Sequence, residues 1–145
     1  MALIGTVLSL LGVATAGYLT IAHYTSPKVL ACSESGVVNC AKVTSSSYSV
    51  VLGLPVAVVG LAYFVVMLAL QVPAAWRSPR PEIRLARVAC SVLGAVSVLW
   101  LVYVELFRLD AICLYCTAVH VISVALFALT LIGTALVAPA GVEPS

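Results

Sequence analysis

Residues 110–120 read Asp-Ala-Ile-Cys-Leu-Tyr-Cys-Thr-Ala-Val-His and lead directly into an apolar run that continues to Val137. Cys113 and Cys116 are three positions apart, so on a helix they share one face and are near enough for a disulfide. A helix N-terminus favours the thiolate, which is the attacking form in thiol–disulfide exchange. This motif indicates a redox-active pair at the entrance of an apolar helix.

The composition around this motif is typical of an integral membrane protein. Of the 145 residues, 63% are hydrophobic and 8% are charged, whereas soluble domains average about 25% charged residues. The formal net charge of +2 gives no indication of a nucleic-acid partner. We therefore expect the lipid bilayer, and no nucleic acid, as the surroundings of the chain.

Stretches without Asp, Glu, Lys or Arg divide the chain into four apolar segments, each able to hold a span of about 20 residues. We predict an all-α bundle of four transmembrane helices that forms one domain over residues 1–145. The expected spans are residues 3–24, 51–72, 86–107 and 112–137, with a redox loop at 25–49 and a disordered tail at 138–145. A cleaved signal peptide is the alternative for the first span, but no Lys or Arg precedes its apolar run.

The loops predict the orientation. Four arginines lie between Pro73 and Arg87, and the positive-inside rule places this segment in the cytoplasm. Both termini are then cytoplasmic, and both cysteine pairs face the opposite side. In a bacterium that side of the inner (plasma) membrane is oxidising and permits disulfides.

A second pair, Cys32 and Cys40, lies in the polar loop. Its two interpretations are a static disulfide that closes a small loop, and a reducible disulfide that shuttles electrons between soluble proteins and Cys113. Cys90, the fifth cysteine, is interpreted as a packing residue. Two pairs on one membrane chain suggest electron transfer from pair to pair.

Several polar residues near the motif have alternative roles. His120 shares the helix face of Cys113 and Cys116, and together with Cys40 these residues have the donor set of a zinc site, although structural zinc favours compact polar modules. Asp110 is expected to cap the last span, and Pro55 to lie in the first turn of the second. Glu105, Arg108 and Asp110 are expected to form an interfacial cluster of ion pairs.

Taken together, these features resemble the vitamin K epoxide reductase family. The resemblance rests on Cys-x7-Cys followed by Lys-Val-Thr-Ser-Ser-Ser-Tyr, on an apolar span opening with Gly53-Leu54-Pro55, and on a late C-x-x-C. It covers roughly Leu10 to Leu136. It differs from the DsbB-type quinone reductases, in which the C-x-x-C comes first in the chain.

The resemblance implies a four-helix bundle around a quinone site. Cys116 would be the thiol nearest the quinone and Cys113 its resolving partner. Cys40 would attack the disulfide of Cys113, and Cys32 would exchange with an external thioredoxin-fold protein. Ser46 would match a Ser/Thr near the active site, and His120 would take the place of a Tyr of animal members as a quinone contact. The Asn that contacts the quinone in animal members has no counterpart between Ser45 and Leu61.

These observations predict a membrane thiol–disulfide oxidoreductase. It would oxidise a separate, DsbA-like thioredoxin-fold partner through Cys32/Cys40 and Cys113/Cys116, and reduce ubiquinone, menaquinone or a vitamin K-type quinone. The alternatives are a quinone or vitamin K epoxide reductase supplied by a thioredoxin-like donor, and a non-enzymatic metal-binding membrane protein.

Overall fold

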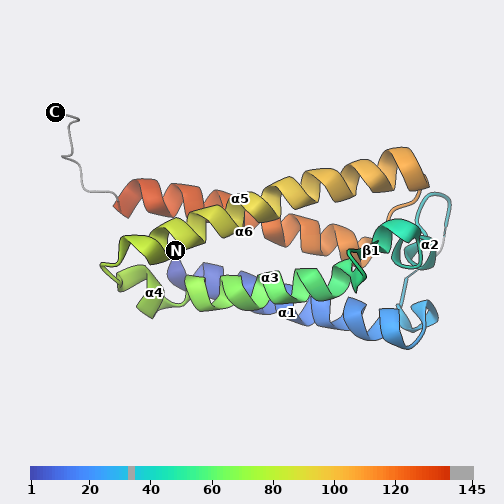
Figure 1. The fold of residues 1–145 in the computed structure, drawn as a ribbon, viewed down its shortest axis with the longest axis horizontal. Helices are drawn as coiled ribbons and strands as arrows, with labels where there is room; N and C mark the ends of the chain where they lie inside the picture. Colours follow the sequence, from blue (N-terminus) through green and yellow to red (C-terminus); the bar gives the residue numbers. More distant parts are fainter. Residues whose placement is uncertain (33–34, 138–145) are drawn as a thin grey trace.

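Four long helices run side by side between the two ends of an elongated bundle (Figure 1). They are α1 (Ala2–Tyr24), α3 (Val56–Gln71), α5 (Pro81–Val104) and α6 (Leu114–Val137). The computed structural model describes residues 1–32 and 35–137, so the predicted tail 138–145 lies outside the described residues.

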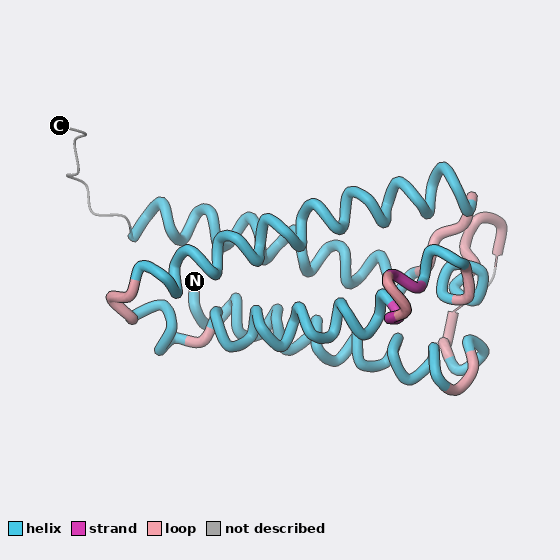
Figure 2. The backbone as a smooth tube through the Cα atoms, viewed as in Figure 1, coloured by secondary structure: helices cyan, strands magenta, loops and turns pink. Residues whose placement is uncertain are grey.

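Short elements gather at the two ends of the bundle (Figure 2). At one end the loop after α1 holds η1 (Pro27–Val29), α2 (Cys40–Thr44), η2 (Ser47–Ser49) and the strands β1 (Val50–Val51) and β2 (Leu54–Pro55). At the same end, α5 continues into a π-helical turn, η3 (Glu105–Leu109). The other end holds α4 (Pro73–Arg77) and Met1. The cysteine-bearing loop and the Arg-rich segment therefore lie at opposite ends of the bundle.

The helices have the length and composition of membrane spans. Within the described residues, α1, α6 and the continuous segment Pro81–Leu109 are long and apolar enough to cross a membrane. Helix α3 is apolar but has only 16 residues, or about 24 Å at 1.5 Å per residue. Large apolar side chains such as Leu3, Leu99 and Leu136 are exposed on the outer faces. The protein is an all-α membrane protein.

The second span begins later than predicted. Residues 50–55 form a tight antiparallel hairpin, in which Val50 pairs with Pro55 and Val51 with Leu54. The turn has positive φ angles at Leu52 (52°) and Gly53 (81°), which a helix cannot contain. Pro55 precedes α3 instead of lying in its first turn.

Asp110 does not cap the last span, contrary to the prediction. It has left-handed φ/ψ angles of 47° and 41° and ends the π-helical turn η3. Asp is one of the few residues that tolerate this conformation. The chain then needs three further residues to reverse direction before α6 begins at Leu114.

Small residues allow the helices to approach closely. The buried face of α1 includes Gly5, Ser9, Gly12 and Ala16, a spacing that favours tight helix packing in lipid. A Cβ added at Gly12 would overlap the ring of Phe64 on α3, and one added at Gly94 would overlap the Tyr63 hydroxyl. The packing of the central core therefore requires glycine at these two positions.

Polar side chains fasten the end of the bundle opposite the cysteines. Arg87 is buried there, and it donates hydrogen bonds to the carbonyls of Leu70 (2.8 Å) and Ala75 (2.9 Å). Its guanidinium lies 4.0 Å from the centre of the Trp76 ring. A carbonyl at the end of α3 and one in α4 thus accept hydrogen bonds from Arg87 in place of water.

We predict that Gly12→Ala destabilises the bundle by about 1–3 kcal/mol, because the added methyl overpacks the core against Phe64. Thermal unfolding of the purified protein in detergent micelles would measure the change. Gly17→Ala is the matched control, since it lies on the same helix and its added Cβ meets nothing within 4 Å. It should leave stability unchanged or slightly raised. Equal unfolding temperatures for Gly12→Ala and wild type would contradict the packing described here.

Candidate functional site

Cys113 caps the helix that carries its partner. It is the residue immediately before α6, and its Sγ accepts the backbone N–H of Cys116 at 3.4 Å. Its carbonyl accepts the N–H of Thr117 at 2.9 Å, the first bond of the helix. This is the geometry of an N-cap, with sulfur in the place that a Ser or Asp oxygen usually takes.

The two cysteines of this motif differ in their surroundings. Cys113 is fully buried, whereas Cys116 is partly exposed, and both are free thiols in this structure. The pKa of Cys113 is lowered from its usual value, first because the Cys116 thiol donates a hydrogen bond to it. Backbone N–H groups of Tyr115 and Cys116 act in the same direction, while burial and the nearby Glu105 carboxylate oppose the shift. The buried sulfur is therefore the one that more readily holds the negative charge.

The loop cysteines, Cys32 and Cys40, are joined by a disulfide with a Cα–Cα distance of 6.2 Å. Cys40 begins α2 and is buried, and Cys32 is partly exposed. The two ends of this disulfide thus face different surroundings, one inside the protein and one near its surface.

A backbone bridge holds the two cysteine segments side by side. The N–H of Asn39 donates to the carbonyl of Ile112 at 3.0 Å, and the N–H of Ile112 donates to the carbonyl of Val37 at 2.8 Å. Cys40 and Cys113 directly follow the bridging residues, and both belong to one buried cluster with Leu19, Ala22 and Val43. The structure thus brings together the two pairs, which are 73 residues apart in the sequence when counted from Cys40 to Cys113.

Two tyrosines fix the chain just before Cys32. Tyr18 donates a hydrogen bond to the carbonyl of Val29 at 2.7 Å, and Tyr115 donates one to the carbonyl of Ala31 at 3.1 Å. Their rings meet edge to face with centroids 5.1 Å apart. Tyr115 therefore connects the C-x-x-C segment directly to the loop that carries the other pair.

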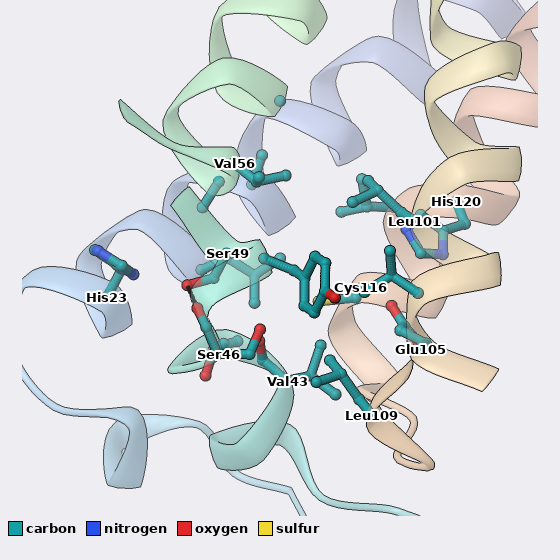
Figure 3. A pocket seen from close by; sticks show the side chains of 18 residues that line it. His23, Val43, Ser46, Ser49, Val56, Leu101, Glu105, Leu109, Cys116 and His120 are labelled. Atoms are coloured by element: carbon teal, nitrogen blue, oxygen red, sulfur yellow. Dashed lines mark hydrogen bonds between the residues drawn. The ribbon is translucent and has the colours of Figure 1, made fainter. Parts of the chain in front are cut away.

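An apolar cavity of about 120 Å³ lies beside Cys116. It is enclosed by all four long helices together with α2, η2 and η3. Figure 3 shows Glu105, Cys116 and His120 at one side of it and His23, Ser46 and Ser49 at the other. The other lining residues are Ala16, Leu19, Val43, Thr44, Tyr48, Val56, Ala57, Gly60, Leu101, Val104, Leu109 and Val119.

The predicted residues His120 and Ser46 both line this cavity, on opposite walls. His120 is buried on α6, one helical turn after Cys116. The Ser46 hydroxyl donates to the carbonyl of Val43 at 2.9 Å, so its oxygen can still accept a hydrogen bond.

Glu105 is a site residue that was not predicted from the sequence. Only 6% of its surface is exposed, whereas Arg108 and Asp110 are both exposed. The predicted cluster of ion pairs among these three residues is therefore wrong. The available signal was the position of Glu105, which lies at the end of an apolar span, where an ionisable residue is a functional candidate.

The family model described as Vitamin K epoxide reductase family matches residues 3–131. The chain belongs to the vitamin K epoxide reductase family. Comparison with individual curated proteins gives no match.

Membership of the vitamin K epoxide reductase family makes the chain a membrane redox enzyme that works through cysteines. The disulfide and the adjacent thiol pair are the groups in the structure that suit this chemistry. In the part of the chain that the structure describes, no three His, Cys, Asp or Glu side chains could hold a metal ion together. Cys40, Cys113, Cys116 and His120 do not form the zinc-like set considered from the sequence.

Cys90 lies apart from the redox pairs of this vitamin K epoxide reductase family member. It packs at the edge of a second buried cluster, formed by Ala16, Phe64, Met67 and Leu126. We predict that Cys90→Ala keeps at least about half of the oxidoreductase turnover and costs about 1 kcal/mol of stability, as small core truncations usually do. Turnover and thermal unfolding of the purified variant would check this. Loss of electron transfer in a folded Cys90→Ala protein would mean that the two pairs are wrongly assigned.

Proposed function

We propose that the protein generates disulfides by oxidising a separate thioredoxin-fold, DsbA-like partner and reducing a membrane quinone. The observation that carries this proposal is the continuous arrangement from Cys32 to the cavity. Cys40, which is disulfide-bonded to Cys32, and Cys113 belong to one buried cluster beside the backbone bridge to Ile112, and Cys116 lines the apolar cavity.

The partner would react first at Cys32, which is the more exposed sulfur of its disulfide. A partner thiolate attacks Cys32, a mixed disulfide forms, and Cys40 leaves as a thiolate. The second partner thiol resolves this bond, which leaves the partner oxidised and Cys32 and Cys40 reduced. Cys40 then attacks a Cys113–Cys116 disulfide at Cys113, and Cys32 resolves the bond between them. Two electrons thereby move inward to Cys113 and Cys116.

The cavity suits the head group of a quinone, which is the electron acceptor that the family is known to use. Its walls are mostly apolar, and Cys116 and His120 contribute sulfur and imidazole groups on one side. The complete reaction converts two thiols and a quinone into a disulfide and a quinol, so electrons and protons balance. His120 can donate a hydrogen bond to a quinone oxygen.

The proposed orientation has the cysteines on the non-cytoplasmic side of a bacterial inner membrane and the N-terminus in the cytoplasm. It is supported by the separation of the cysteine loop from the Arg-rich α4 segment at opposite ends of the bundle. An oxidising compartment is the place where the disulfide of a partner would persist.

The test of this function uses Cys113→Ser with a short-chain naphthoquinone. Cys116 is then the remaining thiol beside the cavity, the serine oxygen can still cap α6, and the helix N-terminus stabilises the thiolate. We predict a long-wavelength charge-transfer band on adding quinone. Cys116→Ser should lack the band.

Cys90→Ser is the matched control for both variants. It should show no band, because its Cys113/Cys116 pair is complete, and it should form quinol at the wild-type rate. A band in Cys116→Ser and not in Cys113→Ser would reverse the roles of the two cysteines. If neither variant gives a band and wild-type protein forms no quinol, the proposed function is wrong.

We further predict that His120→Ala slows quinone reduction by about tenfold or more, as expected when a donor to the reacting oxygen is lost. Disulfide exchange between Cys32 and a thioredoxin-fold partner should be unchanged, because His120 has no role in that proposed step. His120→Tyr should recover much of the rate, since a phenol can donate the same hydrogen bond. Stopped-flow absorbance of quinol formation measures the effect, and wild-type kinetics in His120→Ala would leave His120 as a packing residue.

A further inference from the structure

We propose that Glu105 accepts a thiol proton from the Cys113/Cys116 pair and passes it to the quinone. This inference rests on the proposed function and adds the path of a proton to it. The structural basis is one carboxyl group that is buried, faces the backbone N–H of Cys113 and lines the same cavity as Cys116.

The position of Glu105 is unusual for a carboxylate. It is 6% exposed at the end of an apolar helix, where burial disfavours the ionised form unless a partner compensates. Its side chain faces the backbone N–H of Cys113, and within the described residues no cation offsets its charge. The π-helical turn begins at Glu105, and such turns occur often at functional sites.

The proposed reaction needs a proton acceptor beside Cys113. Cys113 is fully buried, so water cannot take a proton from it directly. When the disulfide forms, two S–H bonds are lost, one S–S bond forms, two electrons pass to the quinone and two protons must reach its oxygens. Glu105 can take one proton from the thiol pair and release it into the cavity, returning to its ionised form.

The cavity and its rim hold other ionisable groups that the test must separate from Glu105. Cys116 and His120 lie on α6, His23 on α1 and Tyr48 on η2, and all four line the cavity. Arg108 on the same π turn and Lys42 on the adjacent α2 are exposed. Of the residues that line the cavity, Glu105 is the one with a carboxyl group.

The experiment follows single-turnover quinol formation after mixing reduced protein with a short-chain naphthoquinone between pH 6 and pH 9. Glu105→Gln keeps the shape of the side chain and removes its ability to accept a proton. We expect its rate to fall by about tenfold or more at pH 7.5, where the thiols are still protonated and the wild-type carboxyl can ionise, with apparent quinone affinity changed less than about twofold. The defect should narrow as the pH rises, because ionised thiols no longer need a base. Glu82→Gln, on an exposed position of the same span, should behave like wild type.

The outcomes are distinct. Wild-type rates in Glu105→Gln, or a defect of equal size at every pH, would overturn the proton-transfer role, since a merely structural effect has no reason to follow thiol ionisation. Failure of folded wild-type protein to reduce any quinone would instead reject the proposed function. If Glu105→Gln does not fold, redox-difference infrared spectra of the wild-type protein test whether Glu105 takes up a proton. They should show a carboxyl band that appears with turnover and shifts in Glu105→Asp, and the absence of that band would overturn the inference.

Discussion

The reciprocal hydrogen bonds between Val37–Asn39 and Ile112 are the interaction on which the rest of the site depends. They join the loop between the first two spans to the turn between the last two. Because Cys40 and Cys113 are the residues that follow, the bridge sets the positions of both buried sulfurs. Tyr18 and Tyr115 hold the chain before Cys32 in the same way. In the proposed relay, electron transfer between the pairs thus requires changes within one packed cluster and no movement of a domain.

The opposite end of the bundle is held by hydrogen bonds between side chains. There Gln71 donates to the Thr130 hydroxyl at 2.9 Å and accepts from the Trp76 indole at 2.9 Å. These bonds satisfy buried polar groups in a region where water is scarce, and such satisfied networks fix a unique packing. One end of the bundle is thus held by side-chain hydrogen bonds, and the cysteine-bearing end is held by backbone hydrogen bonds. The cavity lies between the four helices at the cysteine-bearing end.

The sequence predicted the order and number of the long helices because charged residues are costly in lipid and so mark the ends of each span. It could not predict where the second span begins, since Leu52 and Gly53 read as part of an apolar run although their positive φ angles form a turn. Asp110 was misassigned for a related reason. Its side chain suits a helix N-cap, but its left-handed conformation ends the preceding turn. The burial of Glu105 could not be predicted from the sequence either. In a membrane bundle the lipid-facing and inward-facing positions are both apolar, so the pattern does not show which face of the helix points inward. The proximity of Cys113 and Cys116 could be predicted from their spacing, although Cys113 caps α6 instead of lying on its face, whereas the approach of Cys40 to Cys113 required the tertiary fold.

The cap of α6 has a consequence for the proposed redox cycle, in which the Cys113/Cys116 pair alternates between thiols and a disulfide. A thiolate at Cys113 accepts the Cys116 N–H as a charge-assisted hydrogen bond, and such bonds are roughly twice as strong as neutral ones. A disulfide sulfur at the same place carries no charge and is a weak acceptor. The first turn of α6 is therefore anchored most firmly when the pair is reduced and loosened each time it is oxidised. Helix α6 forms one wall of the cavity, so the strength of its first hydrogen bonds would differ between the reduced and the oxidised pair.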